Sequence, residues 1–237
     1  MTSWFNNLNN NFKGIILAII GFSAFACGDA NAKYLTLAYK PEYIAGMTAV
    51  FGTAICVIFM PFLGGFKRTL QTKKLKFHLM RCALNPIIAL LVLYAYSRLP
   101  LATAYPMIFM APFFATILAI PLFKEKVSIH GWIAIIGGFI GVLIVVRPGA
   151  TDLDPNLYIA LGAGFFIGLL FLSARPLDDK ETLASLAFYP FVANLIIFTP
   201  LVLYYYGLPA QDDFFLFILQ SALTVTGFIC TSVTFRL

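Results

Sequence analysis

Residues 129–147 read IHGWIAIIGGFIGVLIVVR, an apolar stretch that ends at a single arginine. The hydrocarbon core of a bilayer is about 30 Å thick, and an α-helix needs about 20 apolar residues to cross it. This stretch has that length and carries no Asp, Glu, Lys or Arg before Arg147. It therefore predicts a transmembrane helix.

The composition of the whole chain has the same character. Of its 237 residues 61% are hydrophobic and 11% are charged, and the mean hydropathy is +0.90. Soluble domains carry about 25% charged residues, because most of their surface must face water. The composition indicates an integral membrane protein and excludes a disordered chain, a disulfide scaffold and a nucleic-acid-binding protein. The four cysteines lack metal-binding spacing and are interpreted as small buried apolar residues: Cys27, Cys56, Cys82 and Cys230.

Seven further apolar runs resemble the first. The sequence predicts eight spans, joined by short connections that Gly or Pro often punctuates, and hence an all-α, polytopic membrane helix bundle. The expected spans are about 14–35, 42–63, 79–97, 101–123, 129–147, 156–174, 182–206 and 214–235.

The distribution of Lys and Arg predicts the orientation. Cytoplasmic loops of membrane proteins are enriched in both. With the N-terminus inside the cell, twelve of the 16 cations lie on the cytoplasmic side, and the outer side keeps Lys33, Lys40, Arg98 and Arg147. We expect a multi-pass protein of the inner membrane with a cytoplasmic N-terminus. An alternative takes residues 14–27 as a signal sequence, against which the seven later spans argue.

The chain resembles itself after a shift of about 140 residues. The matched pairs are 32–35 with 174–177, 58–61 with 197–200, and 97–99 with 235–237. A unit of five spans places its second copy upside down, as in many secondary transporters, whose substrate sites lie between the repeats. We expect a first repeat over residues 1–149 and a partial second repeat over 150–237, which makes eight spans of an expected ten.

Three motifs carry a family resemblance: YAYSRLPLATAYP (94–106), LFKEKVS (122–128) and GGFIGVLIVVRPG (137–149). They resemble the EamA-type transporters of the drug/metabolite transporter superfamily. The run DANAKYL (29–35) is similar to the first span of a branch that includes S-adenosylmethionine carriers. The resemblance implies a carrier without cofactor that moves a small polar or zwitterionic metabolite by alternating access. Structural roles in the family motif are expected for Glu125, Gly137, Gly141, Pro148 and Gly149.

Polar side chains within the spans are the candidates for the substrate path. Asp29 and Lys33 stand four residues apart on one helix face, and charges at membrane depth are costly and often functional. Two interpretations stay open: the pair lines the path, or Lys33 reaches the interface and Asp29 neutralises it. The further candidates on the path are Asn31, Asn85, Tyr105 and Asn194.

Prolines within the spans are candidates for helix breaks and gating, because each removes a backbone hydrogen bond. They are Pro86, Pro106, Pro112 and Pro190. Arg81 is interpreted as a cytoplasmic anchor, with a substrate gate as the alternative. The glycine pairs Gly137/Gly141 and Gly164/Gly168 have the GxxxG spacing that permits close helix contact.

The sequence offers little for catalysis. His78 and His130 lie at span ends without a second metal ligand, and Asp178, Asp179 and Glu181 are interpreted as a solvated acidic loop. No hydrolase, metalloprotease or nucleotide-binding motif occurs in the sequence. We expect no catalytic residue and no metal site. The alternatives to a carrier are an inactive truncated fragment and an intramembrane enzyme. The expected partners are a small-molecule substrate and the bilayer, with a homodimer or a completing chain left open.

Overall fold

The computed structural model describes residues 9–72, 74–147, 154–174, 181–205 and 207–234, and these residues form helices joined by short turns, without strands. The long helices are α2 (Asn10–Leu35), α3 (Pro41–Phe59), α5 (Leu75–Arg98), α8 (Ile129–Val146), α9 (Leu157–Ala174), α10 (Leu183–Tyr205) and α11 (Phe214–Thr234). The fourth expected span is divided into α6 (Leu101–Ile108) and α7 (Ala111–Phe123). The short elements are α4 (Phe66–Leu70), η1 (Met60–Leu63) and η2 (Gln211–Asp213).

The expected helical membrane bundle is confirmed. Within the described residues, seven helices or helix pairs are long and apolar enough to cross a membrane. The eighth expected span, 156–174, forms α9, whose apolar part from Leu157 to Ser173 is shorter. At 1.5 Å per residue the 18 residues of α9 extend about 27 Å, slightly less than the hydrocarbon thickness.

Local sequence explains several helix ends. Pro41 occupies the first turn of α3, where the missing N–H has no partner to lose. Leu99 is extended because Pro100 follows it, and this ends α5. Ser128 caps α8, since its hydroxyl accepts from the Gly131 N–H at 3.2 Å. Gly64, at φ +127°, turns the chain after η1 and leaves no room for a Cβ against Thr182.

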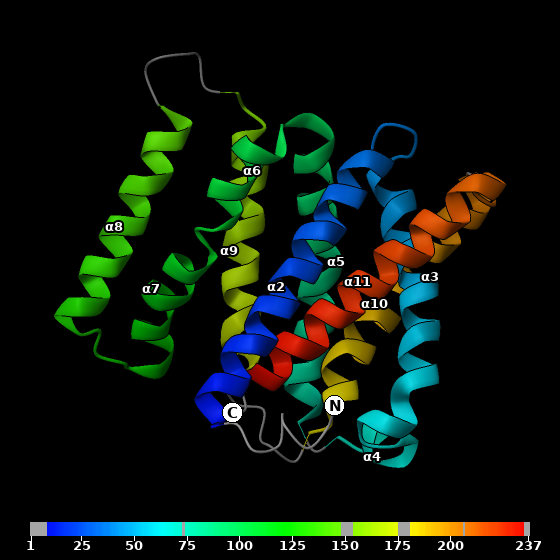
Figure 1. The fold of residues 1–237 in the computed structure, drawn as a ribbon, viewed down its shortest axis with the longest axis horizontal. Helices are drawn as coiled ribbons and strands as arrows, with labels where there is room; N and C mark the ends of the chain where they lie inside the picture. Colours follow the sequence, from blue (N-terminus) through cyan, green and yellow to red (C-terminus); the bar gives the residue numbers. More distant parts are fainter. Residues whose placement is uncertain (1–8, 73, 148–153, 175–180, 206, 235–237) are drawn as a thin grey trace.

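The helices cross the bundle alternately in both directions (Figure 1). Two pairs pack along much of their length, α2 with α11 and α3 with α10. Helix α5 lies against both α9 and α10, and α9 also packs on α6 and α7. Helix α8 stands at one side, packs mainly on α6 and has no buried residue. The end of the bundle that holds α4 and the first turns of α5 and α10 is called the α4 end below.

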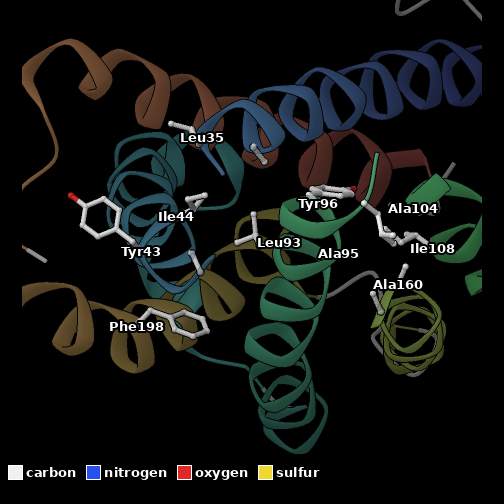
Figure 2. Packing of buried hydrophobic residues seen from close by; sticks show 14 of the residues in the cluster. Leu35, Tyr43, Ile44, Leu93, Ala95, Tyr96, Ala104, Ile108, Ala160 and Phe198 are labelled. Carbon is white, nitrogen blue, oxygen red and sulfur yellow. The ribbon is translucent and has the colours of Figure 1, made fainter. Parts of the chain in front are cut away.

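The main apolar core lies where α2, α3, α5, α6, α9, α10 and α11 converge (Figure 2). Its largest fully buried side chains include Tyr43, Tyr96 and Phe198. A smaller cluster around Cys56 and Phe191 joins α3 to α10. The core therefore joins the helices of the first half of the chain to those of the second half.

The break between α6 and α7 falls at Phe109 and Met110, between the two predicted breakers Pro106 and Pro112. Helix α9 lies directly against this break. A Cβ on Gly164 would stand 2.7 Å from the Met107 carbonyl oxygen, and one on Gly168 would stand 2.8 Å from that of Ala111. These two glycines therefore make the close backbone contact expected of their spacing. A Cβ on Gly137 or Gly141 would meet nothing within 4 Å.

Candidate functional site

Asp29 lies within the membrane-spanning part of α2, in contact with an aromatic cluster. The Tyr105 hydroxyl donates a hydrogen bond to Asp29 Oδ2 at 3.2 Å. The Tyr105 ring stacks on Phe109, with centroids 5.3 Å apart, and meets Tyr96 edge-on at 6.2 Å. A carboxylate beside aromatic faces attracts cations, both through its charge and through the rings. The structure thus brings two of the sequence candidates, Asp29 and Tyr105, into one place.

Lys33 does not neutralise Asp29. Its Nζ donates to the carbonyl oxygens of Tyr96 at 2.5 Å and Leu99 at 3.1 Å. These carbonyls belong to the last turn of α5, which lacks intrahelical partners and carries the negative end of the helix dipole. Within the described residues, no ion pair joins Lys33 to Asp29. Lys33 therefore caps α5 and is not the partner of Asp29.

Lys33→Met is expected to lower the free energy of unfolding by about 1.5–3 kcal/mol, the range for hydrogen bonds to a charged group. The two α5 carbonyls would lose their donor, while the aromatic cluster around Asp29 stays in place. Thermal unfolding of the purified protein in detergent measures the loss. Lys67→Met, on the exposed side of α4, is the matched control. Equal melting temperatures for the two variants would contradict the capping role.

Asn31 turns toward α11. Its Nδ2 donates to the Leu216 carbonyl oxygen and to Gln220 Oε1, each at 3.0 Å. Both donors of this amide are therefore used to join α2 to α11. Its place on the substrate path stays a prediction, whereas its contact with α11 is structural.

Asn85 and Asn194 meet in the buried interior, between α5 and α10. Asn194 Nδ2 donates to Asn85 Oδ1 at 3.0 Å, and both residues are 8% exposed. A proline lies close to each of them, Pro86 within α5 and Pro190 within α10. Asn194 Oδ1 has no hydrogen-bond partner in the described part of the chain. The pair places a polar contact, with one free acceptor, between the two halves of the bundle.

A double-mutant cycle tests the Asn85–Asn194 contact. Each single change to Leu is expected to cost about 1–3 kcal/mol, because it leaves the partner amide buried and unsatisfied. The double variant N85L/N194L should cost less than the two single changes together. The difference is expected to be about 0.6–1.7 kcal/mol, as for other polar pairs between membrane helices. Additive losses in chemical unfolding would show that the two amides do not interact.

A second polar cluster lies at the α4 end. Glu181 Oε1 accepts from the Thr72 hydroxyl at 2.7 Å, and its Oε2 lies 3.2 Å from His78 Nε2. His78 is 1% exposed and Glu181 is 7% exposed. The interpretation of Glu181 as part of a solvated loop is therefore wrong: it is buried against α5. Asp178 and Asp179 lie outside the described residues.

Arg81 is also buried, at 5% exposure, one turn from His78 along α5. An anchor in the headgroup region would be exposed, so its interpretation as an interfacial anchor is wrong. Sequence reasoning missed this cluster, although one signal was present. His78, Arg81 and Asn85 follow one another at spacings of three and four, which places them on one face of α5.

The remaining candidates are placed as follows. Pro106 and Pro112 line an apolar groove of about 660 Å³ between α6–α7 and α8, in which Thr116 is the polar side chain. Such a lining suits apolar groups rather than a charged solute. Glu125 is exposed in the turn before α8. Pro148 and Gly149 lie outside the described residues.

These features define a class of protein. A polytopic bundle with a broken span, a carboxylate within the membrane and buried amides beside helix-internal prolines is typical of membrane transport proteins. The model of the EamA-like transporter family matches residues 12–147, which is more than half of the chain. The chain belongs to the EamA-like transporter family. It is a transporter and not an enzyme.

Individual relatives agree with this assignment. The S-adenosylmethionine uptake transporter of Rickettsia prowazekii is 23% identical over 216 residues, which cover 91% of this chain and 73% of that protein. The protein of the same name in Rickettsia bellii is 26% identical, over 87% of this chain and 70% of its own length. A riboflavin transporter of Vibrio cholerae is 27% identical, over 79% of this chain and 62% of its own length.

Proposed function

We propose that the chain is a secondary transporter that moves a small polar or zwitterionic metabolite, such as S-adenosylmethionine or an amino-acid-like solute. The names of its Rickettsia relatives support a metabolite of this kind. The observation that carries the proposal is Asp29, a carboxylate within a span that contacts Tyr105 and is not neutralised by Lys33. S-adenosylmethionine has a sulfonium and an ammonium group, whereas riboflavin is uncharged at neutral pH. The carboxylate therefore favours a solute with a cationic group.

The packing of the helices supports alternating access between two inverted repeats, residues 1–149 and 150–237. Exchanging α2, α3 and α5 with α9, α10 and α11 turns the α2–α11 contact into α9–α5, and α3–α11 into α10–α5. The α3–α10 contact is turned into itself. Such a two-fold relation lets one half rock against the other around a central site. Asn85 and Asn194 lie on the α5–α10 contact between the two halves.

We place the protein in the inner membrane with its N-terminus in the cytoplasm. The α4 end carries many cations, among them Lys67, Arg68, Lys74 and Lys76, whereas Lys33, Lys40 and Arg98 lie at the opposite end. The excess of Lys and Arg in cytoplasmic loops supports this orientation.

Counterflow into proteoliposomes tests the proposal. The purified protein is reconstituted, the vesicles are loaded with unlabelled S-adenosylmethionine, and labelled S-adenosylmethionine is added outside. We expect transient accumulation above the level of protein-free vesicles, without any nucleotide as an energy source. The same vesicles are tested with riboflavin and with a set of amino acids. Accumulation of riboflavin alone would contradict a zwitterionic substrate, and accumulation of none of these solutes would contradict the proposed function.

A further inference from the structure

The Arg81 guanidinium is a buried cation with very few partners. Nη1 contacts Ser173 Oγ and Nη2 contacts the Leu186 carbonyl oxygen, both at 3.4 Å. Nε has no partner in the described part of the chain. A guanidinium offers five N–H donors, and here only two make contacts, both at the long limit of hydrogen-bond distances. None of the described carboxylates forms an ion pair with it, and Glu181 contacts Thr72 and His78, the latter one turn from Arg81 along α5.

A buried charge without a counter-ion is costly, and within membrane helices such charges mark sites for substrates or ions. A ligand with a negative charge would offset the free-energy cost of burying this cation. Arg81 lies where α5, α9 and α10 meet, since its contacts come from Ser173 on α9 and Leu186 on α10. A ligand that binds there contacts both halves of the bundle.

The geometry of a guanidinium fits one class of ligand best. Its planar fork binds a carboxylate through two parallel hydrogen bonds. Asn85 lies four residues further along α5, about 6 Å along the helix axis, and accepts a hydrogen bond from Asn194. Asn194 Oδ1 is an acceptor without a partner among the described residues. An acceptor at this position suits an ammonium group next to a carboxylate.

We propose that Arg81 binds the carboxylate of a substrate of the α-amino-acid type, with Asn194 Oδ1 accepting from its ammonium group. This assignment rests on the proposed function and deepens it. Arg81 is then a second binding site, or station, separate from the one at Asp29. Asp29 contacts Tyr105, whose ring meets Tyr96. Residues 81 and 96 of α5 are about 22 Å apart along the helix axis. The assignment also gives a reason for selection against solutes without a carboxylate.

Competition between two matched probes tests the assignment. S-adenosylmethionine and its decarboxylated analogue share the sulfonium and the adenosine, and differ in the carboxylate. Each competes with labelled S-adenosylmethionine for binding to the purified wild-type protein. We expect the wild type to prefer the intact molecule by about 10- to 100-fold, and Arg81→Gln to bind both probes with similar, low affinity. Arg81→Lys, which keeps the charge and loses the fork, should fall between the two.

Stability supplies a readout that does not depend on transport. Removing a paired, structural arginine destabilises a protein, whereas removing a buried cation without a counter-ion does not. We expect Arg81→Met to melt at the same temperature as the wild type or higher. Arg98→Met, which removes an exposed arginine at the other end of α5, is the matched control for the loss of one charge.

Each outcome bears on the assignment. A wild type that binds both probes equally overturns it, as does Arg81→Gln with unchanged discrimination. A marked loss of stability in Arg81→Met assigns Arg81 a structural role instead. If the protein transports riboflavin but no solute that carries a carboxylate, the assignment of Arg81 is overturned, although the protein remains a transporter. If it transports none of the solutes, both the proposed function and this assignment are overturned.

Discussion

Asp29→Asn is expected to reduce counterflow of S-adenosylmethionine by roughly 10- to 100-fold. The change keeps the size of the side chain and an acceptor for the Tyr105 hydroxyl, so the local packing is retained. What is lost is the negative charge that would face the sulfonium or ammonium group of the solute. Initial rates of labelled uptake into proteoliposomes, corrected for the amount of reconstituted protein, measure the effect.

Two variants control this experiment. Asp29→Glu keeps the charge and should recover part of the rate. Asp212→Asn removes an exposed carboxylate from η2 and should leave the rate unchanged. Full uptake by Asp29→Asn would exclude the carboxylate from the substrate path, although the family assignment would stand.

Gly168→Leu is expected to prevent α9 from packing against the broken span. Its Cβ would lie 2.8 Å from the Ala111 carbonyl oxygen and 3.0 Å from the Ala115 amide nitrogen, and both are backbone atoms that cannot rotate away. Overpacking of this kind costs about 1–3 kcal/mol, and more where the backbone cannot shift. We expect a lower melting temperature and a smaller monodisperse fraction in size-exclusion chromatography.

Gly141→Leu is the matched control, because a Cβ at Gly141 meets nothing within 4 Å. Both glycines belong to GxxxG pairs in apolar helices, so the sequence treats them alike. If the two variants lose the same stability, the close contact between α9 and α7 does not hold the bundle together.

The sequence predicted most of the fold because each membrane helix is specified locally, by an apolar run of sufficient length. The four candidate helix breakers behave differently: Pro106 and Pro112 flank the break in the fourth span, whereas α5 continues through Pro86 and α10 through Pro190, so the prediction of a break at these last two is wrong. The partners of the polar side chains were not predicted. Asn85 and Asn194 were both candidates, but they are 109 residues apart, and their contact depends on how α5 meets α10.

Two charged residues show why composition near a span end is a weak guide. Lys33 binds backbone carbonyls of α5, which no side-chain pattern in the sequence records. Glu181 follows a hydrophilic stretch and was expected in water, yet the fold buries it against His78. The partners of Lys33 are carbonyls at the end of α5, whereas those of Glu181 lie at its start. Both contacts are between residues far apart in the sequence, so they form only when the helices pack.

Access to the two stations from opposite sides of the membrane tests the central claim most directly. Cys27 lies two residues before Asp29, and Cys82 follows Arg81. Variants that retain only one of these two cysteines, the others replaced by Ala, are labelled in oriented vesicles with a membrane-impermeant thiol reagent from either side. We predict that S-adenosylmethionine changes the labelling rates of the two cysteines in opposite directions. Cys82 should be labelled from the cytoplasmic side and Cys27 from the outer side. Labelling of both from the same side, or rates that the solute leaves unchanged, would contradict transport by alternating access through this interior.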